Sequence, residues 1–274
     1  MVYKIVDAGR SMFFKVGYSV INMQMKNQKA QVTIFIIIAI LIIAVVVLFF
    51  SFRGEIGKEK PVSPEIAPIQ NFVEECIYDT GEDALYFIGL HGGYYLPNKF
   101  SNSLGIPYYI KDNKTLMPSK EKIELEVSKY IDEALPLCVG NFTEFENFQI
   151  RQGKIKTQTN ILEEQVILNV DYPLTIIKGE EKSRIEKFEN IKIPVRLGII
   201  YNASSFIVSE HLKNTGEICM SCLLDLQTRE GLSIMTQSED NTIIYNIVDS
   251  ESLLKEKENI FEPEKYSFRF AVEY

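Results

Sequence analysis

Two cysteines separated by two residues, Cys219 and Cys222, form the pattern in this sequence that is best suited to covalent chemistry. A Cys-x-x-Cys pair can cycle between dithiol and disulfide, and it is most reactive at the start of a helix, where the helix dipole lowers the thiol pKa. Here the pair is expected to follow a helix that ends near Asn214, with two leucines directly after it. We therefore predict a local structural bridge, and an envelope thiol oxidoreductase is the alternative.

Cys76 and Cys138 complete the set of four cysteines. Four cysteines can pair in three ways, and the sequence does not choose among them. A bond between Cys76 and Cys138 would join two expected helices across a loop of about 60 residues and contribute roughly 3–5 kcal/mol in the chain-entropy model. Cys219 would then pair with Cys222. A zinc site made of all four is disfavoured, because Cys76 and Cys138 are not a second close pair.

The remaining polar residues predict no active site. His211 falls near the end of an expected helix, where a protonated imidazole would complement the helix dipole, and a structural role is predicted for it. The two histidines lie far apart in sequence, and there is no Walker motif and no dinucleotide-binding glycine motif. The sequence therefore predicts no catalytic residue, no metal and no cofactor, and it favours a protein that is not an enzyme.

The chain is acidic, with a formal net charge of −8. Nucleic-acid binding needs clustered Lys and Arg, so no nucleic-acid partner is expected. Three Asn-x-Ser/Thr sequons, at Asn113, Asn141 and Asn202, are glycosylation candidates, although the last falls within an expected helix. Two tyrosine pairs, 94–95 and 108–109, flank a proline-containing loop that could contact a partner.

A charge-free window from residue 30 to residue 52 contains seventeen consecutive apolar residues, 34–50. A helix needs about 20 mostly apolar residues to cross the hydrocarbon core of a bilayer. In a single pass, only a helix satisfies its own backbone polar groups there. A cleaved secretory signal would have a shorter apolar run that ends in small residues, whereas bulky residues end this one. We therefore predict a single transmembrane helix at residues 31–52.

The charge on either side of this helix predicts its orientation. Residues 1–52 carry five basic residues against one acidic residue, and the rest of the chain carries 24 against 36. Basic flanks stay on the cytoplasmic side during insertion. The expected order is a basic cytoplasmic leader (1–30), the transmembrane helix (31–52), a tether containing glycine and proline (53–64) and an extracytoplasmic domain (65–274). The protein is thus placed in the cell membrane, with that domain outside the cytoplasm.

The residues just before the apolar run, Lys29-Ala30-Gln31-Val32-Thr33, resemble the class III (type IV prepilin-like) signal of archaeal surface proteins. The resemblance implies that a prepilin peptidase would cut between Ala30 and Gln31, leaving the apolar helix as the new N-terminus. Met25 opens a short basic leader, so Met1 and Met25 are alternative starts. Phe35 stands where the family usually has an acidic residue, and an uncleaved signal anchor is favoured over a pilin-like filament subunit.

Apolar periodicity predicts an α+β fold for residues 65–274. Gly81 is expected to interrupt the first helix, and Ser119 is expected to cap the second. A mostly antiparallel sheet with helices packed on one side should result. The expected elements, in order, are helices at 65–90 and 119–135, a strand at 166–176, a hairpin loop at 178–182, a partner strand at 184–193, a helix opening at Pro194 and a last strand at 266–274.

Together these features favour a membrane-anchored envelope protein that works through protein–protein or surface contacts, including self-association. The first alternative is a pilin-like filament subunit cleaved before Gln31. The second is a thiol oxidoreductase that uses Cys219 and Cys222. The membrane and other proteins are the expected partners.

Overall fold

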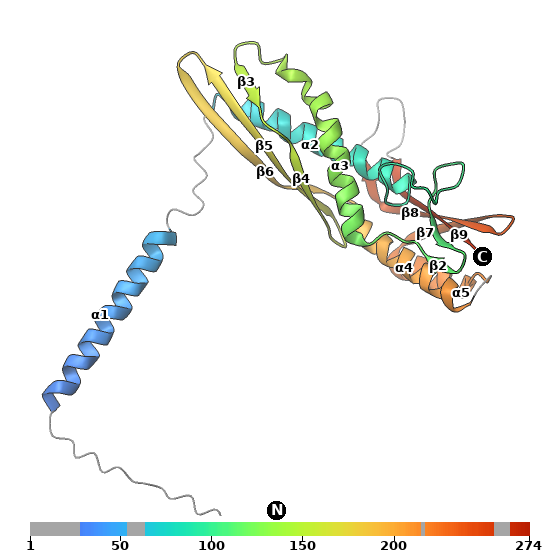
Figure 1. The fold of residues 1–274 in the computed structure, drawn as a ribbon, viewed down its shortest axis with the longest axis horizontal. Helices are drawn as coiled ribbons and strands as arrows, with labels where there is room; N and C mark the ends of the chain where they lie inside the picture. The colour runs from blue at the N-terminus through green and yellow to red at the C-terminus, as the bar shows by residue number, and fades with distance from the viewer. Residues whose placement is uncertain (1–27, 54–63, 215–216, 255–263) are drawn as a thin grey trace, which may run out of the picture. The chain divides into compact units, whose positions relative to one another are not determined.

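The computed structural model describes residues 28–53, 64–214, 217–254 and 264–274, and in its first helix it describes the side chains of residues 35–47. The chain divides into two compact units, Met1–Pro61 and Val62–Tyr274. The described residues form an α+β fold with five α-helices and mostly antiparallel strands (Figure 1). The predicted fold class is confirmed at this level.

The described residues of the first unit form the helix α1 (Gln28–Arg53). Its described side chains, residues 35–47, are all exposed and apolar. Among the described residues, no helix satisfies the combined length and hydropathy criteria for a membrane span. Most of the predicted leader, up to residue 27, and the tether over residues 54–63 lie outside the described residues.

A four-stranded sheet is built around one long strand in the second unit, β5 (Val166–Lys178). One edge of β5 pairs along its whole length with β6 (Glu181–Ile193), so the predicted hairpin is confirmed. The other edge pairs first with β4 (Lys156–Ile161) and then with β3 (Gln149–Gln152). The turn between β5 and β6 places Gly179 at a φ of +60°, which glycine adopts without strain.

A second sheet has five strands in the order β2-β1-β9-β8-β7. Its first edge is parallel, because β1 pairs with β9 in the same direction, and its other pairings are antiparallel. The expectation of one antiparallel sheet is therefore corrected to two sheets. The strand bounds are β1 Tyr108–Lys111, β2 Lys114–Thr115, β7 Leu232–Glu239, β8 Thr242–Leu254 and β9 Glu264–Glu273.

Two helices, α2 (Ala67–Leu90) and α3 (Lys120–Val139), confirm the first two predicted helices and pack against each other. α2 also contacts β6 of one sheet and β9 of the other, so it joins the two sheets. Gly81 does not interrupt α2. A Cβ atom there would lie 2.5 Å from Ile193 and 2.6 Å from Leu168, so this glycine marks a close approach of the helix to the four-stranded sheet.

The start of α3 follows the prediction, since Ser119 accepts a hydrogen bond from the amide of Lys122. The helix extends four residues beyond its predicted end and carries Pro136 inside it. A glycine with a φ of +50°, Gly140, then ends the helix, and a short 3-10 turn, Gly140–Phe142, follows.

The third predicted helix begins later than expected, because α4 covers Leu197–Lys213 rather than opening at Pro194. A fifth helix, α5 (Met220–Glu230), is not among the predicted elements. Arg196 fixes the entry to α4. Its guanidinium donates to both carboxylate oxygens of Asp249 in β8, at 2.6 and 3.0 Å, and to the backbone oxygen of Glu230 at the end of α5.

A single main core of buried apolar side chains joins both sheets to α2, α3, α4 and α5. α2 contributes a buried stripe at three-to-four spacing, as its amphipathic pattern predicts. Stacked rings of Tyr109, Phe270 and Tyr245 cross three strands of the five-stranded sheet. All members of this core lie in the second unit, and this shared core positions α4 and α5 against the sheet.

Candidate functional site

The structure selects one of the three cysteine pairings. Cys76, buried in α2, is bonded to Cys138 in the last turn of α3, with 5.7 Å between their Cα atoms. Cys219 is bonded to Cys222, with 5.2 Å between their Cα atoms. The first bond spans 62 residues and joins two packed helices. In the chain-entropy model such a bond contributes roughly 4 kcal/mol, whereas a bond between near neighbours contributes far less.

The Cys219–Cys222 pair lies at the start of a helix, which corrects the sequence-based interpretation. Cys219 is the N-cap residue of α5, and its sulfur accepts a hydrogen bond from the amide of Cys222 at 3.3 Å. The hydroxyl of Ser221 lies 3.6 Å from the same sulfur. A sulfur in a disulfide carries no hydrogen, so both contacts are donated to Cys219. Donors of this kind at the start of a helix stabilise negative charge on a cysteine sulfur.

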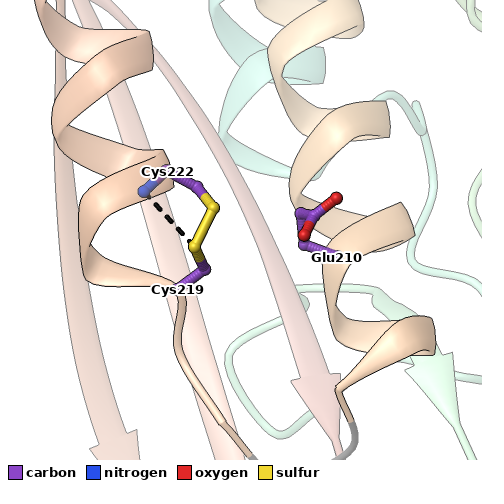
Figure 2. Close-up of side chains that lie close together, drawn as sticks. All are labelled: Glu210, Cys219 and Cys222. Carbon is purple, nitrogen blue, oxygen red and sulfur yellow. Dashed lines mark hydrogen bonds between the residues drawn. A yellow bond between two sulfur atoms is a disulfide. The ribbon is translucent and has the colours of Figure 1, made fainter.

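Glu210, in the last turn of α4, faces this disulfide (Figure 2). One carboxylate oxygen and the two sulfur atoms all lie within 4.8 Å of one another. Lys213 pairs with the same carboxylate at 2.7 Å and offsets part of its charge. Because the two sulfurs are bonded to each other, neither is a thiolate, and the three side chains do not form a metal site in this oxidised state.

The cavity beside the disulfide is small, about 10 Å³, and Phe206, Glu217 and His211 are among the residues that line it. A space of this size accommodates about one water molecule. A small-molecule substrate therefore has no room in this cavity. Chemistry at this disulfide has to take place with a reactant that approaches it from the surface of the domain.

His211 is buried, which agrees with a structural role and not with a charged imidazole at a helix end. Its Nε2 lies 2.5 Å from the hydroxyl of Tyr245, and its Nδ1 has no hydrogen-bond partner among the described residues. Burial lowers the pKa of His211 below its ordinary value of 6.5, because the charged form loses its hydration. The side chain is therefore neutral at pH 7, and its role is structural.

The other predicted site residues lie apart from this disulfide. Ala30 and Gln31 lie in the first turns of α1, and their side chains are outside those described. Asn113 and Asn141 are exposed, with φ values of +57° and +59° in turns. Asn202 is exposed on α4, where it lines a different cavity. The serine of that third sequon, Ser204, is fully buried and donates to the backbone oxygen of Ile200.

Sequence reasoning missed Glu210 as a neighbour of the cysteine pair. The residue precedes Cys219 by only nine positions, but the two lie on different helices, and the second of these was not predicted. A sequence signal for α5 does exist. Gly231 follows it with a φ of +68°, the usual glycine stop of a helix, and Arg229 stands in the last turn.

Comparison of the chain with family models, with curated proteins and with solved structures gives no match. The fold and the site define an α+β domain with two disulfides, one that joins its helices and one at the start of a helix.

Proposed function

We propose that α1 anchors this protein in the cell membrane and that the second unit works outside the cytoplasm through contacts with other proteins. The observation that carries the anchor is an unbroken apolar run, residues 34–50, inside one helix, Gln28–Arg53. The described side chains of this helix, residues 35–47, are exposed on every side. A helix that is apolar all round needs an apolar surrounding, and lipid provides one.

Two further features support an extracytoplasmic second unit. Basic residues outnumber acidic ones by five to one in residues 1–52, which favours a cytoplasmic N-terminus. All four cysteines of the chain are in disulfides, and such bonds persist in oxidising compartments.

A loop between α2 and β1, residues 94–104, supports a role in protein contacts. Leu96 and Leu104 are 57% and 71% exposed, and they lie with Phe100 in an ordered segment. Asn98 and Asn102 hold this segment, because their side-chain oxygens accept backbone amide hydrogen bonds at 2.7 to 3.0 Å. Exposed apolar side chains on a fixed backbone are typical of surfaces that bind other proteins.

Membrane fractionation tests the anchor. The full chain, produced in a prokaryotic host, should stay in the membrane pellet after an alkaline wash, and protease added to intact cells or spheroplasts should digest the second unit. A soluble product, or a second unit that is protected until the membrane is broken, would contradict the proposal. N-terminal sequencing of the same material tests processing: a chain that begins at Gln31 supports the pilin-like alternative over the uncleaved anchor.

Substitution of the 94–104 loop tests the contact surface. Leu96→Ser and Leu104→Ser together should weaken chemical cross-linking of the protein in intact cells by at least about 10-fold, since a buried leucine contributes roughly 1.5–3 kcal/mol. Leu137→Ser is the matched control, because Leu137 is equally apolar and 82% exposed on α3. Equal cross-linking of the two variants would remove this loop from the proposal.

A further inference from the structure

The disulfide at the start of α5 differs from the other disulfide in its surroundings. Cys76 is buried within the core and Cys138 is exposed, and the bond between them joins two packed helices. Cys219 and Cys222 are both half-buried, and they close a loop within one turn of chain. Opening the second bond therefore leaves the core and the packing of α2 on α3 unchanged. A bond with this freedom can be opened and closed without unfolding the domain.

The two sulfurs of this bond are not equivalent. Cys219 receives hydrogen bonds from the amide of Cys222 and from the hydroxyl of Ser221, and it caps an eleven-residue helix. These donors and the helix dipole stabilise negative charge on the Cys219 sulfur. Glu210 opposes that charge, but Lys213 pairs with its carboxylate. In thiol–disulfide exchange, the sulfur with the lower thiol pKa is the better leaving group.

We propose that Cys219–Cys222 is a redox-active disulfide that oxidises two cysteines of a partner polypeptide. A thiolate of the partner attacks the sulfur of Cys222, the Cys219–Cys222 bond breaks, and Cys219 leaves with the electron pair as a thiolate. The second partner thiolate then attacks the partner sulfur of this mixed disulfide. The partner gains a disulfide, Cys222 leaves and takes up a proton, and two electrons have passed from the partner to this protein.

A polypeptide is the reactant that the surroundings favour. The cavity beside the disulfide, about 10 Å³, excludes a small-molecule substrate. Met220, directly after Cys219, and Leu224, one turn later, are 66% and 65% exposed and share a helix face. Glu210 and Glu217 line the cavity and disfavour an anionic thiol. These features fit a chain segment with apolar or basic residues beside its cysteines.

The first test uses the wild-type full chain in detergent, oxidised and then equilibrated with increasing concentrations of a peptide that carries two cysteines. Acid quenching, alkylation and mapping by mass spectrometry report each bond separately, so Cys76–Cys138 is an internal control. We expect Cys219–Cys222 to open in at least 10-fold less peptide, with one oxidised peptide formed per bond opened. If both bonds open together, or if Cys76–Cys138 opens first, the proposal is overturned.

The second test measures which sulfur leaves more readily. Cys219→Ser and Cys222→Ser each keep one cysteine of the pair, which is loaded with the peptide as a mixed disulfide and released by added thiol. Release from Cys219 should be at least 10-fold faster than release from Cys222, and adding Ser221→Ala to Cys222→Ser should slow it about 3-fold. Equal or reversed rates contradict the assigned roles. The first test needs no variant, so a variant that fails to fold leaves the proposal testable.

Discussion

At the scale of single residues, the buried ion pair between Arg196 and Asp249 shows that one contact can position several helices and strands. Asp249 is fully buried and accepts from Arg196, from the hydroxyl of Ser252 and from the amide of Glu251. Burial alone would raise the pKa of Asp249, but these hydrogen bonds and the charge of Arg196 together lower it. The pair holds the start of α4, the end of α5 and β8 together, and so fixes the frame of the Cys219–Cys222 site.

Asp249→Asn should therefore destabilise the domain strongly. The variant leaves the guanidinium of Arg196 largely buried without its main counter-charge, and breaking a buried pair costs about 3 kcal/mol or more. The matched control is Asp171→Asn, because Asp171 pairs with Lys187 at an exposed position, where such pairs contribute less than about 1 kcal/mol. Urea unfolding of both variants gives the comparison, and equal losses would contradict this account.

His211 predicts how stability depends on pH. The pKa of His211 in the folded protein is below 6.5, its ordinary value in an unfolded chain. At a pH between these two pKa values, the unfolded chain therefore binds more protons than the folded chain. Stability should therefore fall as the pH drops below 6.5, with a slope of at most about 1.4 kcal/mol per pH unit from this residue. His211→Gln should remove that part of the slope in urea unfolding between pH 5 and 7. An unchanged slope would show that His211 does not titrate differently on unfolding.

At the scale of elements, strong periodicity explains which helices and strands were predicted. α2 and α3 have continuous apolar stripes, and β5 along most of its length and β9 over residues 265–270 alternate in burial. α5 was missed because it is short and buries only Leu223 and Leu226. In β8 the buried polar residues Asp249 and Ser252 break the alternation, at the point where its register with β9 shifts. The local sequence pattern cannot predict a buried polar residue whose burial depends on a partner from another element.

Substitution of Gly89 tests how closely α2 packs on the five-stranded sheet. A Cβ atom at Gly89 would lie 2.4 Å from the backbone oxygen of Ser267 in β9, which cannot move without shifting the strand. Gly89→Ala should therefore cost roughly 1–3 kcal/mol in unfolding free energy, despite the better helix propensity of alanine. Gly81→Ala is the control, since it meets only the ends of two flexible side chains. Thermal unfolding should show the larger loss for Gly89→Ala, and the reverse order would contradict this placement.

At the scale of the whole molecule, the pairing of strands could not be predicted from the sequence. The periodicity of residues 266–274 indicates a strand, but not that β9 pairs in parallel with β1, about 160 residues earlier in the chain. For the same reason, the sequence did not predict the division into two sheets or the nearness of Glu210 to Cys219. The proposed anchor, by contrast, is argued only from the composition of a short window of the sequence. Features set by neighbouring residues could be predicted from the sequence, and contacts between residues far apart in the sequence could not.

The division into two units predicts that the second unit folds without the first. Every residue of the main core lies in Val62–Tyr274, and both disulfides lie there too. A domain with its own core can fold alone. A chain of residues 62–274, produced under oxidising conditions, should be soluble, should contain both disulfides, and should match the detergent-solubilised full chain within about 1 kcal/mol in unfolding free energy. A larger loss would mean that the N-terminal unit stabilises the domain, and contacts of α1 would then have to be included in any account of its function.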